Sequence, residues 1–540
     1  MSATRPGSIE SMTDERLRWH PEPDLISPRD PESGRAALER AGSATWAAAL
    51  DYLYDEAFRR AMGEPVRYAD LRALYYGAAA GPGPAPADPT PLAELLEEFR
   101  VRLAPHQLNS WHPRSLSYFT PPPLVASIVG EVLAQFTNQG IDVWHAGPVG
   151  AFVEEEVIRW LCDVVGYGDG AFGILTSGGV MANFLAMTLA RDVHLPLVRG
   201  ADRASPPPRG HALENVRVYV SDQAHFSIAR ALDELGFPPA TLVVVGSDDR
   251  YRLHAAPVAE AIARDRLAGL TPLAIAAVAG STNTGSVDLV PELADLAERE
   301  GLWLHVDAAY GGAARLSDRL AGRIRGLERA DSVTVDPHKW FFQAYDIGGL
   351  LVRRREHLLQ TFHRSPEYYP GSPAATSGGD ARVTEPATTN QPLNFYQHGM
   401  EGTRRWRALK LWLSWKHLGT RGLAHLVELN VETAAHLVRR IRASADFEVE
   451  PAEPELSVVC FRHLPGGRDA AGSLAASDPG AIDAHQDRLA DALERSGEGW
   501  LTTTTLRGRT WLRAGIVNYI TTEADINRLL ATLRALAEEC

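Results

Sequence analysis

The stretch GILTSGGVMANFLAMTLAR, residues 173–191, decides the fold. Its apolar start predicts a strand, a Ser-Gly-Gly turn follows at once, and the remainder has the spacing of a helix with Met181, Phe184, Leu185 and Leu189 on its inner face. Amide groups at a helix N-terminus can bind phosphate, and glycine lets a ligand approach the backbone closely. A glycine turn without a ligand has the same pattern, so this segment alone leaves both interpretations open.

Short apolar runs alternate with helix-like segments between residues 140 and 412. A crossover helix is expected at VPELADLAERE, residues 290–300, whose apolar residues share one face. This alternation is typical of an α/β domain with a mostly parallel sheet and helices on both faces. The strand-like runs are FGILTS, VRVYVSD, ATLVVVGS, LAIAAVAGS, LWLHVDAAY, SVTVD and GGLLVR.

The hexapeptide GDGAFG, residues 168–173, matches the dinucleotide fingerprint GxGxxG by its letters. That fingerprint follows a strand and opens a helix. Here the order is reversed, because the helix-like VEEEVIRWLCDVVGY precedes the glycines and a strand-like run follows them. We therefore interpret GDGAFG as a turn without a dinucleotide.

Charge and composition exclude several classes of protein. The net charge of -14 and the pI near 5.7 disfavour nucleic acid, since binding to phosphates needs a basic surface. No apolar run approaches the roughly 18 to 20 residues of a membrane span, and the N-terminus lacks the apolar centre of a signal peptide, so a cytoplasmic protein with a small-molecule substrate is expected. Cys162, Cys460 and Cys540 have no CxxC spacing, so neither a disulfide framework nor a metal site is predicted.

Three polar side chains follow strand-like runs in the α/β segment, and one ligand explains them all. Asp307, in LWLHVDAAYGG, could cap a loop or hold a pyridine nitrogen protonated. Lys339, in DSVTVDPHKW, could lie at the surface or form an imine with an aldehyde cofactor. His225, in VSDQAH, could also be a core histidine. Together with the phosphate turn, these residues indicate pyridoxal phosphate.

Four motifs in this order resemble those of a known family, the group II pyridoxal-phosphate decarboxylases of aromatic L-amino acids, histidine, glutamate and diaminobutyrate. They are WHP at 111–113, SDQAH at 221–225, HVDAAY at 305–310 and DPHKW at 336–340. The resemblance runs from about residue 111 to 412. It implies the α/β architecture of a fold-type I enzyme, pyridoxal 5'-phosphate as cofactor, and decarboxylation of an L-amino acid to the amine and carbon dioxide.

The resemblance also implies roles for individual residues. Lys339 would carry the cofactor as a Schiff base, Asp307 would bind the pyridine nitrogen, and His225 would stack on the ring as a further catalytic residue. Thr282, in AGSTNTGS, would lie near the cofactor, although it could be only a turn residue. The other implied contacts are Gly178, Gly179 and Val180 around the phosphate, Ala309 under the ring, and Asp336 and His338 beside the lysine and the phosphate.

A catalytic acid is expected in SPEYYPG, residues 365–371. In aromatic-amino-acid decarboxylases a tyrosine on a mobile loop protonates the product carbon, and the resemblance assigns that role to Tyr368. Tyr369 is a neighbouring rival, and an exposed loop tyrosine without a role is the remaining alternative.

The substrate side of the site gives two conflicting indications. Trp111, Tyr118 and Phe119 resemble the apolar wall of the aromatic decarboxylases, although the family pattern departs at YFTPPP, which leaves the placement of the substrate carboxylate open. Asp142, in GIDVW, lies near where those enzymes have a phenylalanine, and diaminobutyrate decarboxylases resemble the chain there. If buried, it would need a protein or substrate cation, and otherwise it is a structural residue. We expect an aromatic L-amino acid, with a diamino acid such as L-2,4-diaminobutyrate as the alternative.

The expected organisation has three segments. Residues 1–124 form an N-terminal helical segment that clasps a dimer, residues 125–410 the large cofactor domain, and residues 411–540 a small α+β domain. Because the sites of fold-type I enzymes lie between subunits, the resemblance implies an obligate homodimer. Two further functions stay open: an oxygen-dependent aromatic acetaldehyde synthase, which Tyr368 disfavours, and a non-catalytic scaffold, which the presence of Lys339 and Asp307 disfavours.

Overall fold

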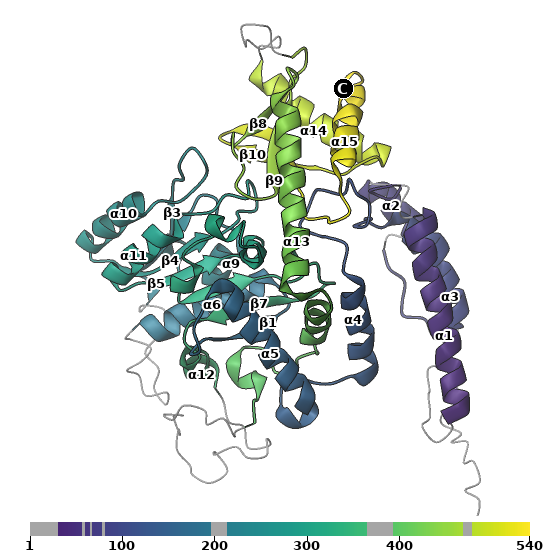
Figure 1. Cartoon of the computed structure of the whole chain (residues 1–540), viewed down its shortest axis with the longest axis horizontal. Coiled ribbons are helices and arrows are strands. Elements are labelled where there is room, and N and C mark those ends of the chain that lie inside the picture. Colours follow the sequence, from purple (N-terminus) through teal and green to yellow (C-terminus); the bar gives the residue numbers. More distant parts are fainter. Residues whose placement is uncertain are drawn as a thin grey trace, which may run out of the picture. The chain divides into compact units, whose positions relative to one another are not determined.

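The computed structural model describes residues 31–56, 60–64, 67–77, 81–195, 213–363, 392–467 and 478–540 (Figure 1). The chain forms two compact units. The first comprises Met1–Ser115 and Asp491–Trp500, and the second comprises Leu116–Ala490 and Leu501–Cys540. No helix among the described residues has the length and apolar character that crossing a membrane requires.

The first unit is helical where it is described. Its helices are α1 (Pro31–Asp51), α2 (Tyr68–Tyr76) and α3 (Leu92–Glu98), with π-helical turns η2 (Tyr52–Glu56) and η4 (Phe99–Leu103) and the 3-10 turn η5 (Ala104–His106). Helices α1 and α3 lie against each other. Two bonds to backbone oxygens close the unit: Tyr52 donates to Leu108 at 3.3 Å, and Asn109 donates to Arg60 at 3.2 Å.

A seven-stranded sheet with the order β1-β7-β6-β5-β4-β2-β3 is the centre of the second unit. Only β7 runs against its neighbours, which confirms the prediction of a mostly parallel sheet. The register aligns Val278 with Asp307 and Asp307 with Thr334, so the carboxyl ends of three strands meet in one row. All seven predicted strands form: β1 (Phe172–Thr176), β2 (Val216–Ser221), β3 (Leu242–Val245), β4 (Thr271–Val278), β5 (Trp303–Asp307), β6 (Ser332–Val335) and β7 (Gly348–Val352).

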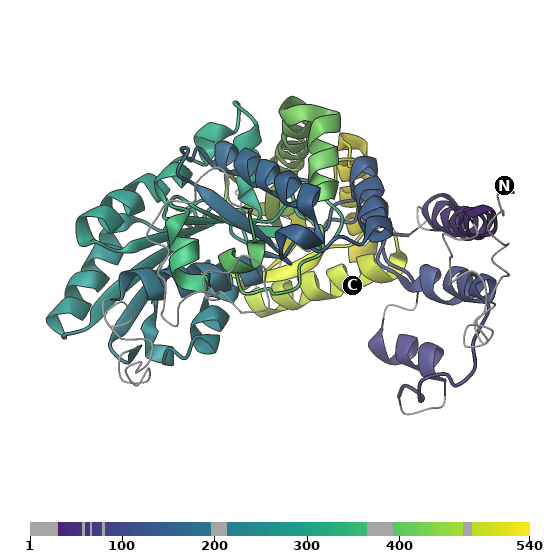
Figure 2. The same ribbon diagram turned by 90° about the horizontal axis from the view of Figure 1, so that it is seen from below.

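Helices cover both faces of this sheet (Figure 1 and Figure 2). Every residue of β1, β5, β6 and β7 is buried, which requires cover on both sides. Helix α6 (Gly179–His194) packs across β4 to β7 and against α9 (Ser227–Glu234) and α12 (Glu356–Phe362). The predicted crossover helix forms as α11 (Val290–Glu300), which packs on β4, β5 and α10 (Ala255–Leu267).

Two further helices and several short turns complete the part of the second unit that surrounds the large sheet. Helix α5 (Pro148–Val165) packs on β1 and β7, and α4 (Val125–Thr137) packs on α13. Gly168 and Gly170 of GDGAFG lie in the turn between α5 and β1, and Gly173 lies in β1, so a helix precedes these glycines and a strand follows them, as the sequence predicted. Short 3-10 turns are η6 (Trp144–Ala146), η7 (Pro239–Thr241), η8 (Gly311–Leu316), η9 (Ala321–Arg323), η10 (Leu327–Arg329) and η12 (Phe395–His398).

A second, antiparallel sheet has the order β10-β11-β9-β8. The long helix α13 (Ala408–Arg442) contacts α4 and α5 near its start and β8, β9 and α15 further along, with a break at Gly419, where φ is 67°. The C-terminal helix begins at a capping box of Thr522 and Asp525. The elements are β8 (Phe447–Glu450), β9 (Val458–His463), α14 (Pro479–Ser496), β10 (Thr502–Leu506), β11 (Arg509–Gly515) and α15 (Glu523–Ala537).

Candidate active site

A cavity of about 340 Å³ opens where β4, β5 and β6 end, beside the first turn of α6. Ligands of open α/β sheets bind at the carboxyl ends of the strands, because the loops that follow converge there. All the residues that the sequence assigned to the cofactor line this cavity: Gly178, Gly179, Val180, His225, Thr282, Asp307, Ala309, Asp336, His338 and Lys339.

The turn before α6 leaves a space that side chains would fill. A Cβ on Gly179 would lie 2.7 Å from Asp336 Oδ2, and one on Gly178 would lie 3.3 Å from the ring of His338. The Thr176 hydroxyl holds the turn through the backbone of Gly178, and no side chain caps the helix. The first amide groups of α6 are therefore free to bind an anion such as a phosphate.

Asp307 reaches the cavity from the end of β5. Its Oδ1 accepts a hydrogen bond from the backbone of Ala309 at 3.1 Å, and its Oδ2 accepts one from Asn183 at 2.8 Å. An ionised carboxylate has about four acceptor positions, so these two donors leave room for a third partner. A protonated pyridine nitrogen in the cavity would be such a donor.

His225 lies beside this carboxylate as a neutral ring. Burial lowers its pKa, and the opposing attraction of Asp307 is smaller. Its Nδ1 lies 2.8 Å from Ser227 Oγ. An uncharged imidazole can lie against an aromatic ring without bringing a second positive charge to it.

Lys339 projects from the loop after β6, where its Nζ lies 3.1 Å from Asp336 Oδ2. Burial by itself would lower the pKa of Lys339, but Asp336 and Asp307 outweigh burial and the pKa is raised. Asp336 Oδ1 is buried and has no hydrogen-bond partner among the described residues. His338 is a further lining residue, and its Nδ1 donates to the Ile347 carbonyl at 2.6 Å. The glycine turn before α6, the Asp307 carboxylate, the His225 imidazole and Lys339 together fit pyridoxal phosphate.

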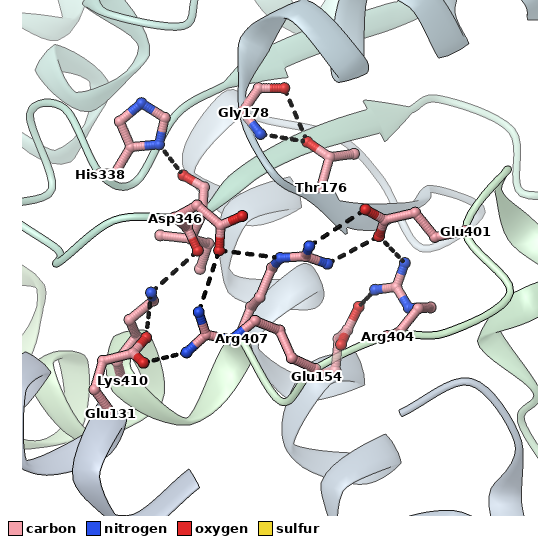
Figure 3. A network of polar contacts seen from close by, with 12 residues as sticks. Glu131, Glu154, Thr176, Gly178, His338, Asp346, Glu401, Arg404, Arg407 and Lys410 are labelled. Atoms are coloured by element: carbon pink, nitrogen blue, oxygen red, sulfur yellow. Dashed lines mark hydrogen bonds and ion pairs between the residues drawn. The ribbon is translucent and has the colours of Figure 1, made fainter. Parts of the chain in front are cut away.

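A network of charged side chains holds the end of the segment that carries the lysine (Figure 3). Lys410 donates to the backbone oxygen of Asp346 at 3.1 Å and also pairs with Glu131. Arg407 lies 3.5 Å from the Asp346 carboxylate and 2.8 Å from Glu401. Lys410 and Arg407 are buried, so loss of one partner would leave a buried charge unpaired. The network therefore resists movement of this segment.

The predicted substrate residues are placed differently from one another. Phe119 lies beside the lysine, with its ring centre 5.9 Å from Nζ. Phe119, Tyr118 and Asp142 are not among the residues that line the cavity, and Tyr118 is exposed. Trp111 belongs to the first unit, and Tyr368 lies outside the described residues, as does Tyr369.

Several residues of the site were given no role from the sequence. The Tyr345 ring lies tilted against His338 with 4.6 Å between ring centres, and its hydroxyl lies 3.1 Å from Thr120 Oγ1. Ser177 and Met181 adjoin residues that the resemblance assigned to the phosphate, and Tyr310 is the last residue of HVDAAY. Asn183 lies within the predicted helix but was not among the residues expected on its inner face. The lining residues without an assigned role are Ser177, Met181, Asn183, Val278, Gly280, Tyr310 and Tyr345.

Arg513, on β11, was also missed. Its guanidinium stacks on Phe119 at 4.8 Å and donates to the backbone of Thr282 at 2.7 Å. It is buried, and its Nη2 has no hydrogen-bond partner among the described residues. A buried guanidinium with a free donor is a candidate to bind a carboxylate, which a raised KM in Arg513→Met would support. Its signal was a cation in the middle of a largely apolar strand.

Comparisons with known proteins agree with this site. Residues 77–464 match the model of the pyridoxal-dependent decarboxylase conserved domain. An aromatic-L-amino-acid decarboxylase from Bacillus atrophaeus is 34% identical over 429 residues, which are 79% of this chain and 82% of that protein. An L-2,4-diaminobutyrate decarboxylase from Acinetobacter baumannii is 29% identical over 437 residues, covering 80% and 81% of the two chains.

Solved structures show the same architecture. The glutamate decarboxylase domain of a diaminobutyrate-pyruvate transaminase and L-2,4-diaminobutyrate decarboxylase from Vibrio parahaemolyticus superposes with a TM-score of 0.78 at 25% identity, over 94% of this chain and 97% of that one. The structure of Oryza sativa TDC with PLP and tryptamine has a TM-score of 0.80 at 24% identity, over 95% and 99%, and shares the fold. The chain therefore belongs to the pyridoxal-dependent decarboxylase family, and it is a fold-type I carboxy-lyase that uses pyridoxal 5'-phosphate.

Proposed function

We propose that this enzyme decarboxylates an L-amino acid to the amine and carbon dioxide, and that its preferred substrate is aromatic. The observation that carries this proposal is an aromatic stack beside Lys339. Phe119 stacks on Tyr310 with 4.2 Å between ring centres, and Tyr310 stacks on Trp340 at 4.8 Å. Flat apolar side chains favour a flat apolar ligand, which supports an aromatic substrate.

The lining residues divide the work of binding the cofactor. In the proposed site Lys339 binds it covalently, the amides that follow Gly178 bind its phosphate, and Asp307 keeps a proton on its pyridine nitrogen. His225 lies against the ring and Asp336 balances the charge of the lysine. When bound, pyridoxal phosphate supplies an electron sink for the bond that breaks between the substrate Cα and its carboxylate. The protein residues contribute by orienting that bond and by holding the pyridinium charge in place.

Asp142 is the residue that distinguishes the two candidate substrates. In the alternative function this carboxylate meets the side-chain ammonium of a diamino acid, and the diaminobutyrate decarboxylase relative keeps that alternative open. Rates of carbon dioxide release should be measured for L-tryptophan, L-tyrosine, L-DOPA and L-2,4-diaminobutyrate in the wild type and in Asp142→Asn. We expect the aromatic substrates to be fastest and to change less than about threefold in the variant, since a neutral ring makes no ion pair.

A diamino substrate that is fastest in the wild type and loses most of its rate in Asp142→Asn would replace the aromatic assignment. Glu401→Gln is not a suitable control, because Glu401 belongs to the buried charge network. Asp163→Asn is suitable, since Asp163 pairs with Arg159 at the surface of α5. This control should leave all four rates unchanged.

We further propose that Tyr368 protonates the product carbon. Tyr368→Phe should divert the reaction from the amine towards aldehyde, peroxide and ammonia, because dioxygen then competes with a slower proton transfer. Product analysis under air and under nitrogen measures this diversion. If Tyr369→Phe shows it and Tyr368→Phe does not, the neighbouring tyrosine is the acid. Aldehyde as the main product of the wild type would instead support the acetaldehyde synthase alternative.

A homodimer is also proposed, with residues 1–124 as its clasp, and the outer face of α4 supports it. The exposed apolar residues of this helix form one stripe, and such stripes on soluble proteins mark contacts with other chains. A second copy is the expected partner, since most soluble oligomers pair like surfaces about a twofold axis. A monomeric mass in solution would contradict the proposal. The stripe consists of Val125, Val129, Val132, Leu133 and Phe136.

A further inference from the structure

A chain of hydrogen bonds beside the cavity joins Asp307 to His225 through two side chains to which the sequence assigned no role. Asn183, on α6, is fully buried, and its Nδ2 donates to Asp307 Oδ2 at 2.8 Å and to Ser227 Oγ at 2.7 Å. Ser227 begins α9 and is fully buried as well. Its Oγ lies 2.8 Å from His225 Nδ1. Two helices that are distant in sequence thus connect the two residues.

The partners of Asn183 determine which way its amide faces. Its Oδ1 accepts from the Thr334 hydroxyl at 2.7 Å and lies 3.0 Å from His305 Nε2. An asparagine offers two donor and two acceptor positions, and all four are occupied. The ionised carboxylate of Asp307 can only accept, so Nδ2 must face it. A reversed amide would place two oxygens against each other.

A second chain of hydrogen bonds ends at the oxygen of the same amide, and its donors also point towards Asp307. The indole N–H of Trp303, which can only donate, lies 3.0 Å from Ser332 Oγ, and that hydroxyl lies 2.9 Å from His305 Nδ1. Burial lowers the pKa of His305 to about 4, so the ring is neutral at neutral pH. Its Nε2–H therefore donates to Asn183 Oδ1. Each hydrogen bond from Trp303 to Asp307 then has one donor and one acceptor, and all of them run in the same direction.

The same reasoning determines where His225 carries its proton. The backbone N–H of Ser227, which can only donate, points to His225 Nδ1 at 3.3 Å. Because Ser227 Oγ accepts from Asn183, its own proton is free to donate to that nitrogen too. A neutral imidazole whose Nδ1 accepts carries its proton on Nε2.

We propose that Asn183 and Ser227 are positioning residues that couple the ionised carboxylate of Asp307 to the Nε2–H tautomer of His225. The group expected at the pyridine nitrogen and the group expected at the ring face are then held by one hydrogen-bonded chain. The inference rests on the proposed site, in which Asp307 and His225 contact the cofactor. It assigns neither residue a contact with the substrate.

Two single variants and their double variant test the coupling. Asn183→Ala removes a bond to a charged group and should weaken cofactor binding about 10- to 100-fold. Ser227→Ala removes a neutral bond and should weaken it less than about tenfold. If the residues act through one chain, Ser227→Ala should have a smaller effect in the Asn183→Ala background than in the wild type. Additive effects would contradict a single chain.

The tautomer is the readout that a merely structural role would not change. Long-range proton–nitrogen spectra of histidine-labelled protein, assigned by the signal lost in His225→Gln, should show the Nε2–H form in the wild type and a mixture of both forms in Ser227→Ala. Loss of the hydroxyl donor also removes a bond that favours neutral His225, so its pKa should rise and the acid limb of the kcat/KM profile should move to higher pH. An Nδ1–H wild type, or a tautomer unchanged in both variants, would overturn the inference.

Thr188→Ala is the matched control. Thr188 lies on the same helix and is buried, but among the described residues its hydroxyl bonds only to the Phe184 carbonyl one turn earlier, at 2.8 Å. This variant should keep the tautomer, the cofactor affinity and the pH profile. The tautomer is measured without substrate, so a wrong substrate assignment would not affect it. Borohydride labelling of Lys339 in the wild type tests the proposed site separately.

Discussion

Lys339→Ala is expected to lower the rate of turnover more than about a thousandfold. This loss corresponds to a rise of roughly 4 kcal/mol in the activation free energy. The reason is that no other described lysine lines the cavity, so no amine can replace it as the covalent partner of the cofactor. The yellow absorbance of the bound cofactor should disappear as well. Rates of carbon dioxide release and a visible spectrum measure both losses.

Lys416→Ala provides the control for this change. Lys416 lies on α13, is half exposed and pairs with Glu156 at 3.3 Å, so its loss removes one lysine without touching the cavity. The control should keep its colour and its rate. After borohydride treatment of the wild type, mass spectrometry should find the cofactor on the peptide that contains DPHKW. Its appearance on another lysine would refute the assignment.

Asp307→Ala should slow the chemical step by about three to four orders of magnitude, or roughly 4 to 5 kcal/mol, while the cofactor stays bound. Without the carboxylate the pyridine nitrogen loses its proton, and a neutral ring is a poor electron sink. Single-turnover rates with the loaded enzyme separate this effect from weaker binding. Asp307→Asn should show a similar loss, since an amide keeps the shape of the side chain without its charge.

Asp265→Asn is the matched control for a buried carboxylate. Asp265 lies on α10 and accepts a hydrogen bond from Tyr219 at 2.9 Å, and it does not line the cavity. This variant should change stability more than it changes turnover. If Asp307→Ala turns over at the wild-type rate, the carboxylate has no part in holding the pyridine proton.

Much of the α/β domain was predictable because its signals are local. Short apolar runs became the strands of the large sheet, and VPELADLAERE became α11, since periodicity alone reports which residues face a core. The turn at Gly178 was predictable for a similar reason, because few other residues allow the backbone to approach a ligand so closely. The order of elements around GDGAFG, a helix before the glycines and a strand after them, was also predicted from the sequence.

The sequence also predicted that the cofactor residues lie close together, because of where parallel strands end. Asp307 and Lys339 both come after parallel strands, and parallel strands end at one edge. The sequence did not predict contacts between side chains that are distant along the chain. The charge network around Asp346 is one such case, since its cations come from residues 404 to 410 and one of its anions from Glu131. No periodicity reports which charges will meet.

By itself the sequence determined the fold class, the cofactor and ten of the residues that line its cavity, because these depend on strand order, glycine turns and motifs that are contiguous in the chain. Only the tertiary structure decided how those residues are held. Asn183 became a junction because α6 lies across β5 and β6, and Arg513 of β11 contacts Phe119, which is far from it in the sequence. Hydrogen-bond direction and burial depend on contacts in space, so they exist only once the chain has packed.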